Sequence, residues 1–401
     1  MGSIVPMFNK PVTELTKEDI DALVENEVPE SKVLDYKGDL PTENKDFAAD
    51  VAAFANAAGG FIIFGVPEKK DADGKRTGIP ASADGIPGLN SDEVIRRLEA
   101  IVRTNIDPKL SGLHWHTIPG FPKGPILILH IPRSWSAPHM LTVGESRFPS
   151  RNDRNKVWLD VREIRSAFVR STELPALIHR FRDERLGKII AGATPIKLKP
   201  RAKLVLHLVP FASVSEGAAI DLATWGKRPP APLGSGGWDS KYNNDGFISY
   251  RDLNEGLIQS YLQVFRTGAL ETVTTLRERR PDGLTLANLW WHEEDIIDKT
   301  KAYLERYREA GLELPLIALV SLLDAKGLTV PESGMRDVSV GMYVSDRDTL
   351  LLPNVQIQDY GDDALPKLFK PAFDALWQSL GFPRSFCYDK DGIWNGEDFR
   401  W

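Results

Sequence analysis

Four charged residues near the start of the chain have the types and spacing that a phosphodiester-cleaving site requires. Glu30, Asp35 and Lys37 fall within one short stretch, and Glu68 follows an apolar run that ends at Val66. Carboxylate oxygens are hard ligands for Mg²⁺ or Mn²⁺, and a neighbouring lysine can orient a water molecule and neutralise developing charge. All four are therefore candidate catalytic residues, with Glu30, Asp35 and Glu68 as candidate metal ligands.

The elements around these residues decide whether the carboxylates can meet. The short strand predicted here places Asp35 and Lys37 on one face and turns Leu34 and Tyr36 away. Glu30 is an odd number of residues from Asp35, so a straight strand would point it to the opposite face. It can converge only from a preceding turn, which a proline before it favours. An ion pair between Asp35 and Lys37 with no further role is the simpler alternative.

A helix followed by two glycines and an apolar strand continues this stretch. Apolar residues at helical spacing predict a helix from about residue 44 to residue 58. Gly59 supplies the left-handed residue that commonly ends a helix. The strand FIIFGV, from Phe61, is apolar on both faces and is expected to be central in a sheet. Glycines that cradle phosphates precede a helix instead of following one, so a helix stop explains this pair best.

A basic segment with interleaved aromatic residues lies further along the chain. Its candidate nucleic-acid-binding residues are Arg147, Arg151, Arg154 and Lys156, and Phe148 and Trp158 lie among them. The cations could contact phosphates, and the rings could stack on exposed bases. The alternative places both rings in the core with solvated arginines between them.

The bulk composition is that of an ordinary soluble protein. The chain has 401 residues, 42% hydrophobic and 26% charged, with a formal net charge of −6. Yet residues 147–203 hold 15 Lys and Arg against 6 Asp and Glu, which gives +9. Such asymmetry can mark a polyanion-facing surface, and helices with solvated basic faces are the alternative. No apolar run approaches the roughly 18–20 residues of a membrane span, so a membrane is not an expected partner. The lone Cys387 and the absence of a signal-like N-terminus favour the cytoplasm.

Two domains are expected. Residues 1–191 form the first, residues 192–200 a proline-containing linker, and residues 201–401 a second domain of mixed helices and strands. Two helices, at 160–170 and 174–190, are predicted to carry the basic bias. Residues 257–271 fit either a strand or a helix, and so does LPLIALVSLLDA. The second domain shows no catalytic signature, so partner recognition, sensing and homo-oligomerisation are alternatives for it.

The first domain resembles a known family. ESKVLDYKG followed by DVAAFANAAGGFIIFGV is similar to the Schlafen-type AlbA_2 domain, whose hallmark is an acidic-x-Lys strand and an AFANxxGG segment. PRSWSAPHM and RFPSRNDRNKVWLDVREIRSAF resemble the rest of that module. In this chain Asp35 stands where the family commonly has a longer Glu.

The resemblance implies a mixed α/β (α+β) nucleic-acid-binding module, which in some members is a metal-dependent endoribonuclease that cuts structured RNA such as tRNA. It implies Glu30, Asp35 and Glu68 as ligands of Mg²⁺ or Mn²⁺, and a setting in bacterial defence or stress response. Lys37 would then assist the water or the scissile phosphate. The alternative is a non-catalytic regulator or interaction protein that binds RNA or DNA through the same domain, with RNA favoured.

Overall fold

The computed structural model describes residues 8, 12–110, 112–144, 146–152, 155–214, 219–251, 257–277, 280–312, 314–330, 344–358, 360 and 364–396. The chain divides into two compact units, residues 1–173 and 174–401. The division falls inside a helix, whereas the sequence placed the boundary in the linker at residues 192–200. We describe each unit by itself.

The first unit is built on a four-stranded sheet with the order β1-β2-β7-β6. β1 is parallel to β2, and the β2–β7 and β6–β7 pairs are antiparallel. The strands of this sheet are β1 (Leu34–Lys37), β2 (Gly60–Phe64), β6 (His114–Phe121) and β7 (Gly124–Ile131). The helices of the unit are η1 (Val12–Glu14), α1 (Lys17–Glu25), α2 (Asn44–Asn56), α3 (Ser91–Asn105) and the start of α4 (Val161–Ile190). The apolar strand from Phe61 therefore lies inside the sheet, as predicted.

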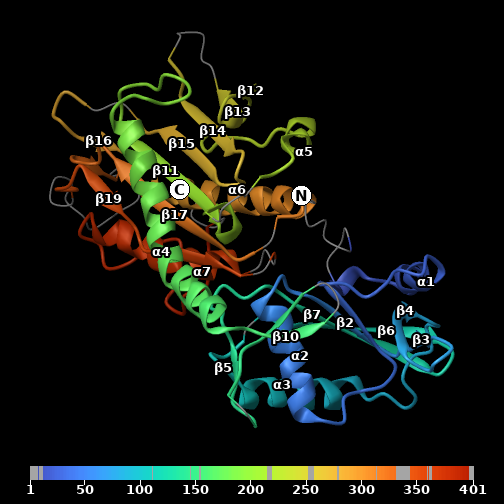
Figure 1. Cartoon of the computed structure of the whole chain (residues 1–401). Helices are drawn as coiled ribbons and strands as arrows, with labels where there is room; N and C mark the ends of the chain where they lie inside the picture. The colour runs from blue at the N-terminus through green and yellow to red at the C-terminus, as the bar shows by residue number, and fades with distance from the viewer. Residues whose placement is uncertain are drawn as a thin grey trace. The chain divides into compact units, whose positions relative to one another are not determined.

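Helices cover both faces of this sheet (Figure 1). On one face, α2 and α3 pack with Ile62 and Leu129 in one apolar core. On the other face, α1 and η1 pack with Leu34, Tyr36 and Ile63 in a second core. Alternate residues of β1 and β2 thus serve different cores, which is why Asp35 and Lys37 emerge together on the α2 side of the edge strand.

Three small antiparallel pairs surround the sheet. They join β3 (Glu68–Lys70) to β4 (Arg76–Pro80), β5 (Ile106–Asp107) to β8 (Met140–Leu141), and β9 (Pro149–Arg151) to β10 (Lys156–Trp158). The β9–β10 hairpin contacts α2, and β4 contacts β1. These pairs bring later segments of the chain to the two sides of β1.

The basic region forms one helix where the sequence predicted two. α4 runs without interruption from Val161 to Ile190 with Pro175 inside it. Pro175 cannot donate to the carbonyl oxygen of Ser171, four residues earlier, and its ring crowds that carbonyl group. A single missing bond in a long, otherwise well-patterned helix does not end it here.

The second unit centres on an eight-stranded sheet. Its order is β12-β13-β14-β15-β11-β17-β19, and β20 also pairs with β17. These strands are β11 (Lys203–Pro210), β12 (Asp239–Asn243), β13 (Gly246–Arg251), β14 (Ser260–Phe265), β15 (Leu270–Thr275), β17 (Leu316–Leu323), β19 (Thr349–Leu351) and β20 (Val355–Ile357). The other elements are η2 (Phe211–Val214), α5 (Leu222–Lys227), β16 (Thr285–Leu286), α6 (Leu289–Glu309), β18 (Leu328–Thr329) and α7 (Leu365–Gln378). Both segments that the sequence left open, 257–271 and LPLIALVSLLDA, contain strands.

A buried ion-pair network fastens the C-terminal half of α4 to this sheet. The guanidinium of Arg185 donates two hydrogen bonds of 2.8 Å to Glu271 on β15, and Tyr261 donates a third of 2.7 Å. His207 Nε2 lies 3.0 Å from the same carboxylate. Burial alone would raise the pKa of Glu271, but the bonds from Arg185 and His207 lower it to about 2. The described helices include none long and apolar enough to cross a membrane.

Candidate functional site

Asp35 and Lys37 form an ion pair on the side of β1 that faces α2. Lys37 Nζ lies 2.7 Å from Asp35 Oδ2, and the Asp35 side chain is only 6% exposed. Burial acts to raise the pKa of Asp35, but hydrogen bonding to Glu30 and attraction to the nearby cations hold it below its usual value. The shared face predicted from strand alternation is confirmed, and Asp35 is held as a buried carboxylate.

Glu30 reaches the same place from a turn ahead of the strand. The chain bends back between Ser31 and Leu34, so Glu30 Oε1 accepts a 2.9 Å hydrogen bond from the Tyr36 amide. Burial, hydrogen bonding to Asp35 and the charge of Asp35 raise the pKa of Glu30 to about 8. At neutral pH the pair therefore shares one proton, with Glu30 as the acid and Asp35 as the carboxylate.

Glu68 approaches from the other side, on the β3–β4 hairpin. Its Oε2 accepts a 3.0 Å hydrogen bond from the Gly78 amide, and its Oε1 lies 3.5 Å from Arg76 Nη1. The Gly78 carbonyl oxygen in turn accepts a 2.7 Å bond from the Glu30 amide. Gly78 has φ +71°, and a Cβ there would lie 3.5 Å from Glu30 Oε2. The hairpin thus brings the charge of Glu68 near Glu30, where it adds to the raised pKa of Glu30.

Arg151 is buried against this group instead of lying on the surface. Its side chain is 4% exposed, and its Nη1 lies 3.7 Å from Asp35 Oδ2. Nη2 donates to the Ser31 carbonyl oxygen at 3.3 Å, and the guanidinium carbon lies 4.2 Å from the centre of the Phe54 ring. In this conformation the guanidinium holds the carboxylate in place. A phosphate contact by Arg151 would require it to leave these partners.

Lys156 continues the charge network toward the surface. Its Nζ donates a 2.8 Å hydrogen bond to Asp50 Oδ1 on α2. Burial acts to lower the pKa of Lys37, but attraction to Asp35 and to Asp50 raises it above its usual value. The sequence interpretation missed Asp50. The signal was its position three residues after Phe47 and four before Phe54, which puts it on the face of α2 that packs inward.

Arg147 and Trp158 lie at the surface, as does Lys156. The Arg147 guanidinium carbon lies 5.5 Å from the centre of the Trp158 ring, and Trp158 is 42% exposed. Phe148 is half-buried. Trp158 is therefore exposed, as stacking on bases would require, and is not in the core as the alternative interpretation placed it. Arg154 lies outside the described residues.

The donor set was tested for its fit to a divalent metal. Among the described residues, no group of three or more His, Cys, Asp or Glu side chains is arranged to hold a metal ion. The carboxyl oxygens of Glu30 and Asp35 are ligands of the kind that a divalent metal ion prefers. A cation could replace the proton that these two groups share. Asp35 Oδ2, although 2.7 Å from Lys37 Nζ, has no partner in hydrogen-bond geometry. A hard cation at this pair would need Glu30 to lose its proton, and Glu68 would have to turn from Gly78 to join it.

The AFANAAGG segment is structural support for this site. Asn56 Nδ2 donates to the carbonyl oxygens of His139 and Pro149, at 2.8 and 2.7 Å, and Asn56 Oδ1 accepts from the His139 amide at 2.6 Å. Gly59, with φ +72°, donates its N–H to the Phe54 carbonyl oxygen and ends α2. Asn56 thus fixes the start of β9 against the end of α2, which positions Arg151. The predicted helix stop at Gly59 is confirmed.

One family of known proteins matches part of the first unit. Residues 30–161 match the family model described as Schlafen, AlbA_2. A solution structure of the N-terminal domain of an ATP-dependent DNA helicase RecG-related protein from Nitrosomonas europaea is 21% identical, with a TM-score of 0.25. That alignment covers 35% of this chain and 90% of the other. No curated protein matches the sequence.

Proposed function

Because residues 30–161 match the Schlafen AlbA_2 family model, a class of nucleic-acid-binding domain, we propose that the chain binds nucleic acid and cuts structured RNA such as tRNA in a metal-dependent reaction. The observation that carries the proposal is the group formed by Glu30, on the turn before the edge strand β1, with Asp35 and Lys37 on that strand. The Asp35 carboxylate is buried 2.7 Å from Lys37 Nζ, and burial and the neighbouring Asp35 raise the pKa of Glu30 to about 8. An arrangement of this kind is more typical of a working site than of a structural ion pair.

Each residue of the group has a place in such a reaction. Glu30 and Asp35 would hold Mg²⁺ or Mn²⁺, and Glu68 would join them by turning from Gly78. When bound, the ion would acidify a water molecule and neutralise charge on the scissile phosphate. Lys37, whose charge is stabilised by Asp35 and Asp50, would orient the water or the phosphate. Arg151 keeps Asp35 ionised and in position.

A second candidate function is nucleic-acid binding without cleavage. The observation that favours it is the pairing of Asp35 with two cations, Lys37 at 2.7 Å and Arg151 at 3.7 Å. These cations already neutralise the carboxylate, so the pair could stabilise the domain with no metal. A regulator or interaction protein that uses the same domain would need no more than this.

Binding is the first property to test. Fluorescence anisotropy of labelled tRNA with the full-length protein in EDTA measures affinity with no metal present. The proposal expects binding that weakens as salt rises from 50 to 200 mM, since counterions are released from the phosphates. A chain that binds neither tRNA nor single-stranded RNA or DNA at low salt would refute both candidate functions.

Cleavage separates the two candidates. With Mn²⁺ or Mg²⁺ added, the nuclease cuts tRNA and the pure binder leaves it intact. Asp35→Asn and Glu30→Gln should abolish cutting yet leave the EDTA-resistant affinity within about threefold. Thermal unfolding of each variant shows whether the fold is kept, because an unpaired cation left by Asp35→Asn costs stability.

A further inference from the structure

Several exposed apolar side chains of the described residues lie close together in the sequence, at the end of β10 and the start of α4. Of the large hydrophobic residues that are exposed in the described part of the chain, eleven in all, four lie between residues 158 and 169. These are Trp158, Val161, Phe168 and Val169. Single exposed apolar residues need no explanation, but a run of four beside a candidate site does.

One of the four, Phe168, packs against a further aromatic ring. The ring centres of Phe148 and Phe168 lie 6.0 Å apart in an edge-to-face arrangement, and Phe168 is 46% exposed. The carbonyl oxygen of Phe148 accepts a 2.8 Å hydrogen bond from Leu159, the residue after Trp158. Backbone pairing and ring contact therefore hold the segment at Phe148, the end of β10 and the first turns of α4 together.

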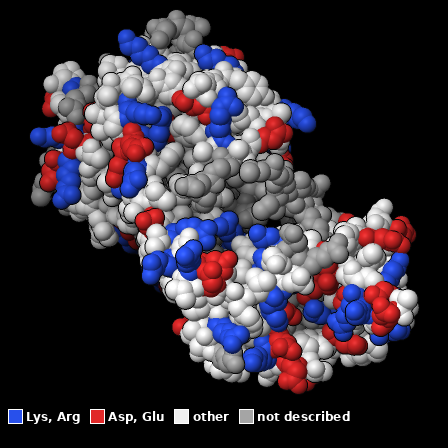
Figure 2. All heavy atoms as spheres, in the orientation of Figure 1, with Lys and Arg blue, Asp and Glu red and all other residues white. Residues whose placement is uncertain are grey.

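Arginine side chains accompany these rings. The Arg147 guanidinium lies beside Trp158. Arg165 is exposed, four residues after Val161 and three before Phe168, so the three share one face of α4. Figure 2 shows Lys and Arg side chains gathered over the lower half of α4. An apolar surface interleaved with arginine fits a polyanion with flat apolar groups better than it fits an apolar protein face.

We propose that Trp158 and Phe168 form a stacking site for unpaired bases, with Arg147 and Arg165 contacting the adjoining phosphates. The inference rests on the proposed function and specifies its ligand as a single-stranded segment or loop. In a paired A-form helix the base faces are covered by their neighbours, so exposed aromatic rings gain nothing from a duplex. Unpaired nucleotides offer a free π-face to each ring.

The site is joined to the carboxyl pair by the β9–β10 hairpin. Trp158 is two residues from Lys156 on β10, and Lys156 is the strand partner of Arg151, which contacts Asp35. A strand seated on Trp158 would thus continue toward the charge network at Lys156 and Asp50. The stacking site would present an unpaired segment to the group that the proposed cleavage uses.

The test compares an unstructured 20-nucleotide RNA, its DNA equivalent and a blunt RNA duplex by anisotropy in EDTA with the full-length protein. We expect at least about tenfold tighter binding of the single strands than of the duplex. Trp158→Ala should weaken single-strand binding about 5- to 100-fold, as loss of one stacked base does, and Trp158→Phe should retain it within about threefold. Arg147→Ala should reduce the slope of log affinity against log salt by about 1.

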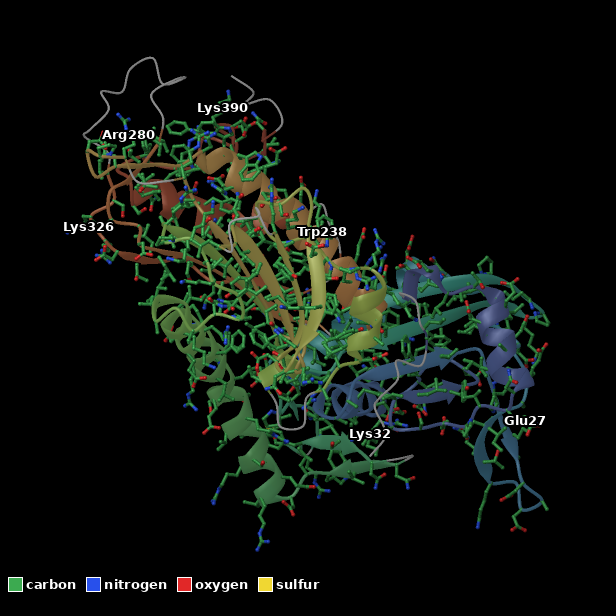
Figure 3. All side chains as sticks on the ribbon, turned by 90° about the horizontal axis from the view of Figure 1, so that it is seen from above. Glu27, Lys32, Trp238, Arg280, Lys326 and Lys390 are labelled. Carbon is green, nitrogen blue, oxygen red and sulfur yellow. The ribbon has the colours of Figure 1, made fainter. Side chains whose placement is uncertain are left out.

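Trp238→Ala is the matched control. Trp238, labelled in Figure 3, is 40% exposed and precedes β12 in the second unit, so its loss should leave affinity unchanged. Equal affinity for duplex and single strands, or a Trp158→Ala variant that binds as the wild type does, would overturn the stacking site and leave nucleic-acid binding standing. Equal affinity for the RNA and DNA single strands would show that the site recognises the bases and does not distinguish the two sugars. Absence of binding to all three probes would overturn the proposed function as well.

Discussion

The proton shared by Glu30 and Asp35 should make the first unit less stable as pH rises. The pKa of Glu30 is about 8 in the folded protein, against an ordinary value of 4.5 for a glutamate side chain. Between these values the folded state therefore holds one proton more than the unfolded state. Its stabilising effect is complete below pH 4.5 and is lost as pH rises through about 8. Glu30→Gln removes this titration, because the amide still donates toward Asp35 and accepts from Tyr36 and has no proton to lose.

The size of the effect follows from the two pKa values. Their full difference corresponds to about 5 kcal/mol in the free energy of unfolding, at about 1.4 kcal/mol per pH unit. Solvent screening of a half-buried carboxyl group reduces this, and we expect the wild type to lose about 2 kcal/mol between pH 5.5 and pH 9. Glu30→Gln should match the wild type at pH 5.5 and exceed its stability by about 2 kcal/mol at pH 9.

The assay is urea unfolding in EDTA at pH 5.5, 7 and 9. Hydrogen-exchange mass spectrometry of the peptide that contains β1 assigns the transition to the first unit. Glu25→Gln, an exposed glutamate of α1, is the control and should follow the wild type at each pH. Wild-type stability that is flat or rising from pH 5.5 to 9, with no advantage for Glu30→Gln, would refute the shared proton.

Two further predictions concern residues that hold the framework. Asn56→Ala removes three hydrogen bonds from Asn56 to His139 and Pro149, and should destabilise the first unit by about 2–4 kcal/mol, read from its urea transition. A destabilisation below about 0.5 kcal/mol would contradict that role. Glu271→Gln leaves Arg185 buried without its carboxylate and should cost the second unit about 3–5 kcal/mol in the same assay. Glu305→Gln, at an exposed glutamate of α6, is the matched control and is expected to cost less than 1 kcal/mol.

Local patterns predicted the parts of the site that local rules govern. Strand alternation alone put Asp35 and Lys37 on one face, and the Gly59 position alone ended α2. Both depend on backbone geometry within a few residues. The mixed α/β class and the AlbA_2 resemblance followed from the same short segments and are confirmed by the family match.

Long-range contacts explain what the sequence did not predict. Arg151 was interpreted as a nucleic-acid-binding residue from its place in the basic segment and from the family resemblance. Its burial depends on the carbonyl oxygen of Ser31, which lies 120 residues away in the chain, and on Phe54. The shared proton likewise depends on the turn before β1, which positions Glu30, and on the β3–β4 hairpin, which carries Glu68. Residue spacing predicts neither of these contacts. The roles of Glu30, Asp35, Lys37 and Glu68 in cleavage stay predictions.

The continuity of α4 was missed for a related reason. The sequence predicted a break near Leu174, yet Leu174 and Ile178 are buried on the same helix. Tertiary packing of an apolar face can maintain a helix through a proline that local propensity would disfavour. The sequence pattern of residues 257–271 fits either a strand or a helix. The strands that pair with this segment, β11 and β13, cannot be identified from that pattern alone.

The most direct test of the account is single-turnover cleavage of end-labelled tRNA by the full-length protein with Mn²⁺. The account predicts cutting by the wild type and by the control Glu25→Gln, no cutting in EDTA, and at least about a hundredfold slower cutting by Glu30→Gln, which still binds the RNA. Intact tRNA with the wild type, or equal rates for the wild type and Glu30→Gln, would contradict it.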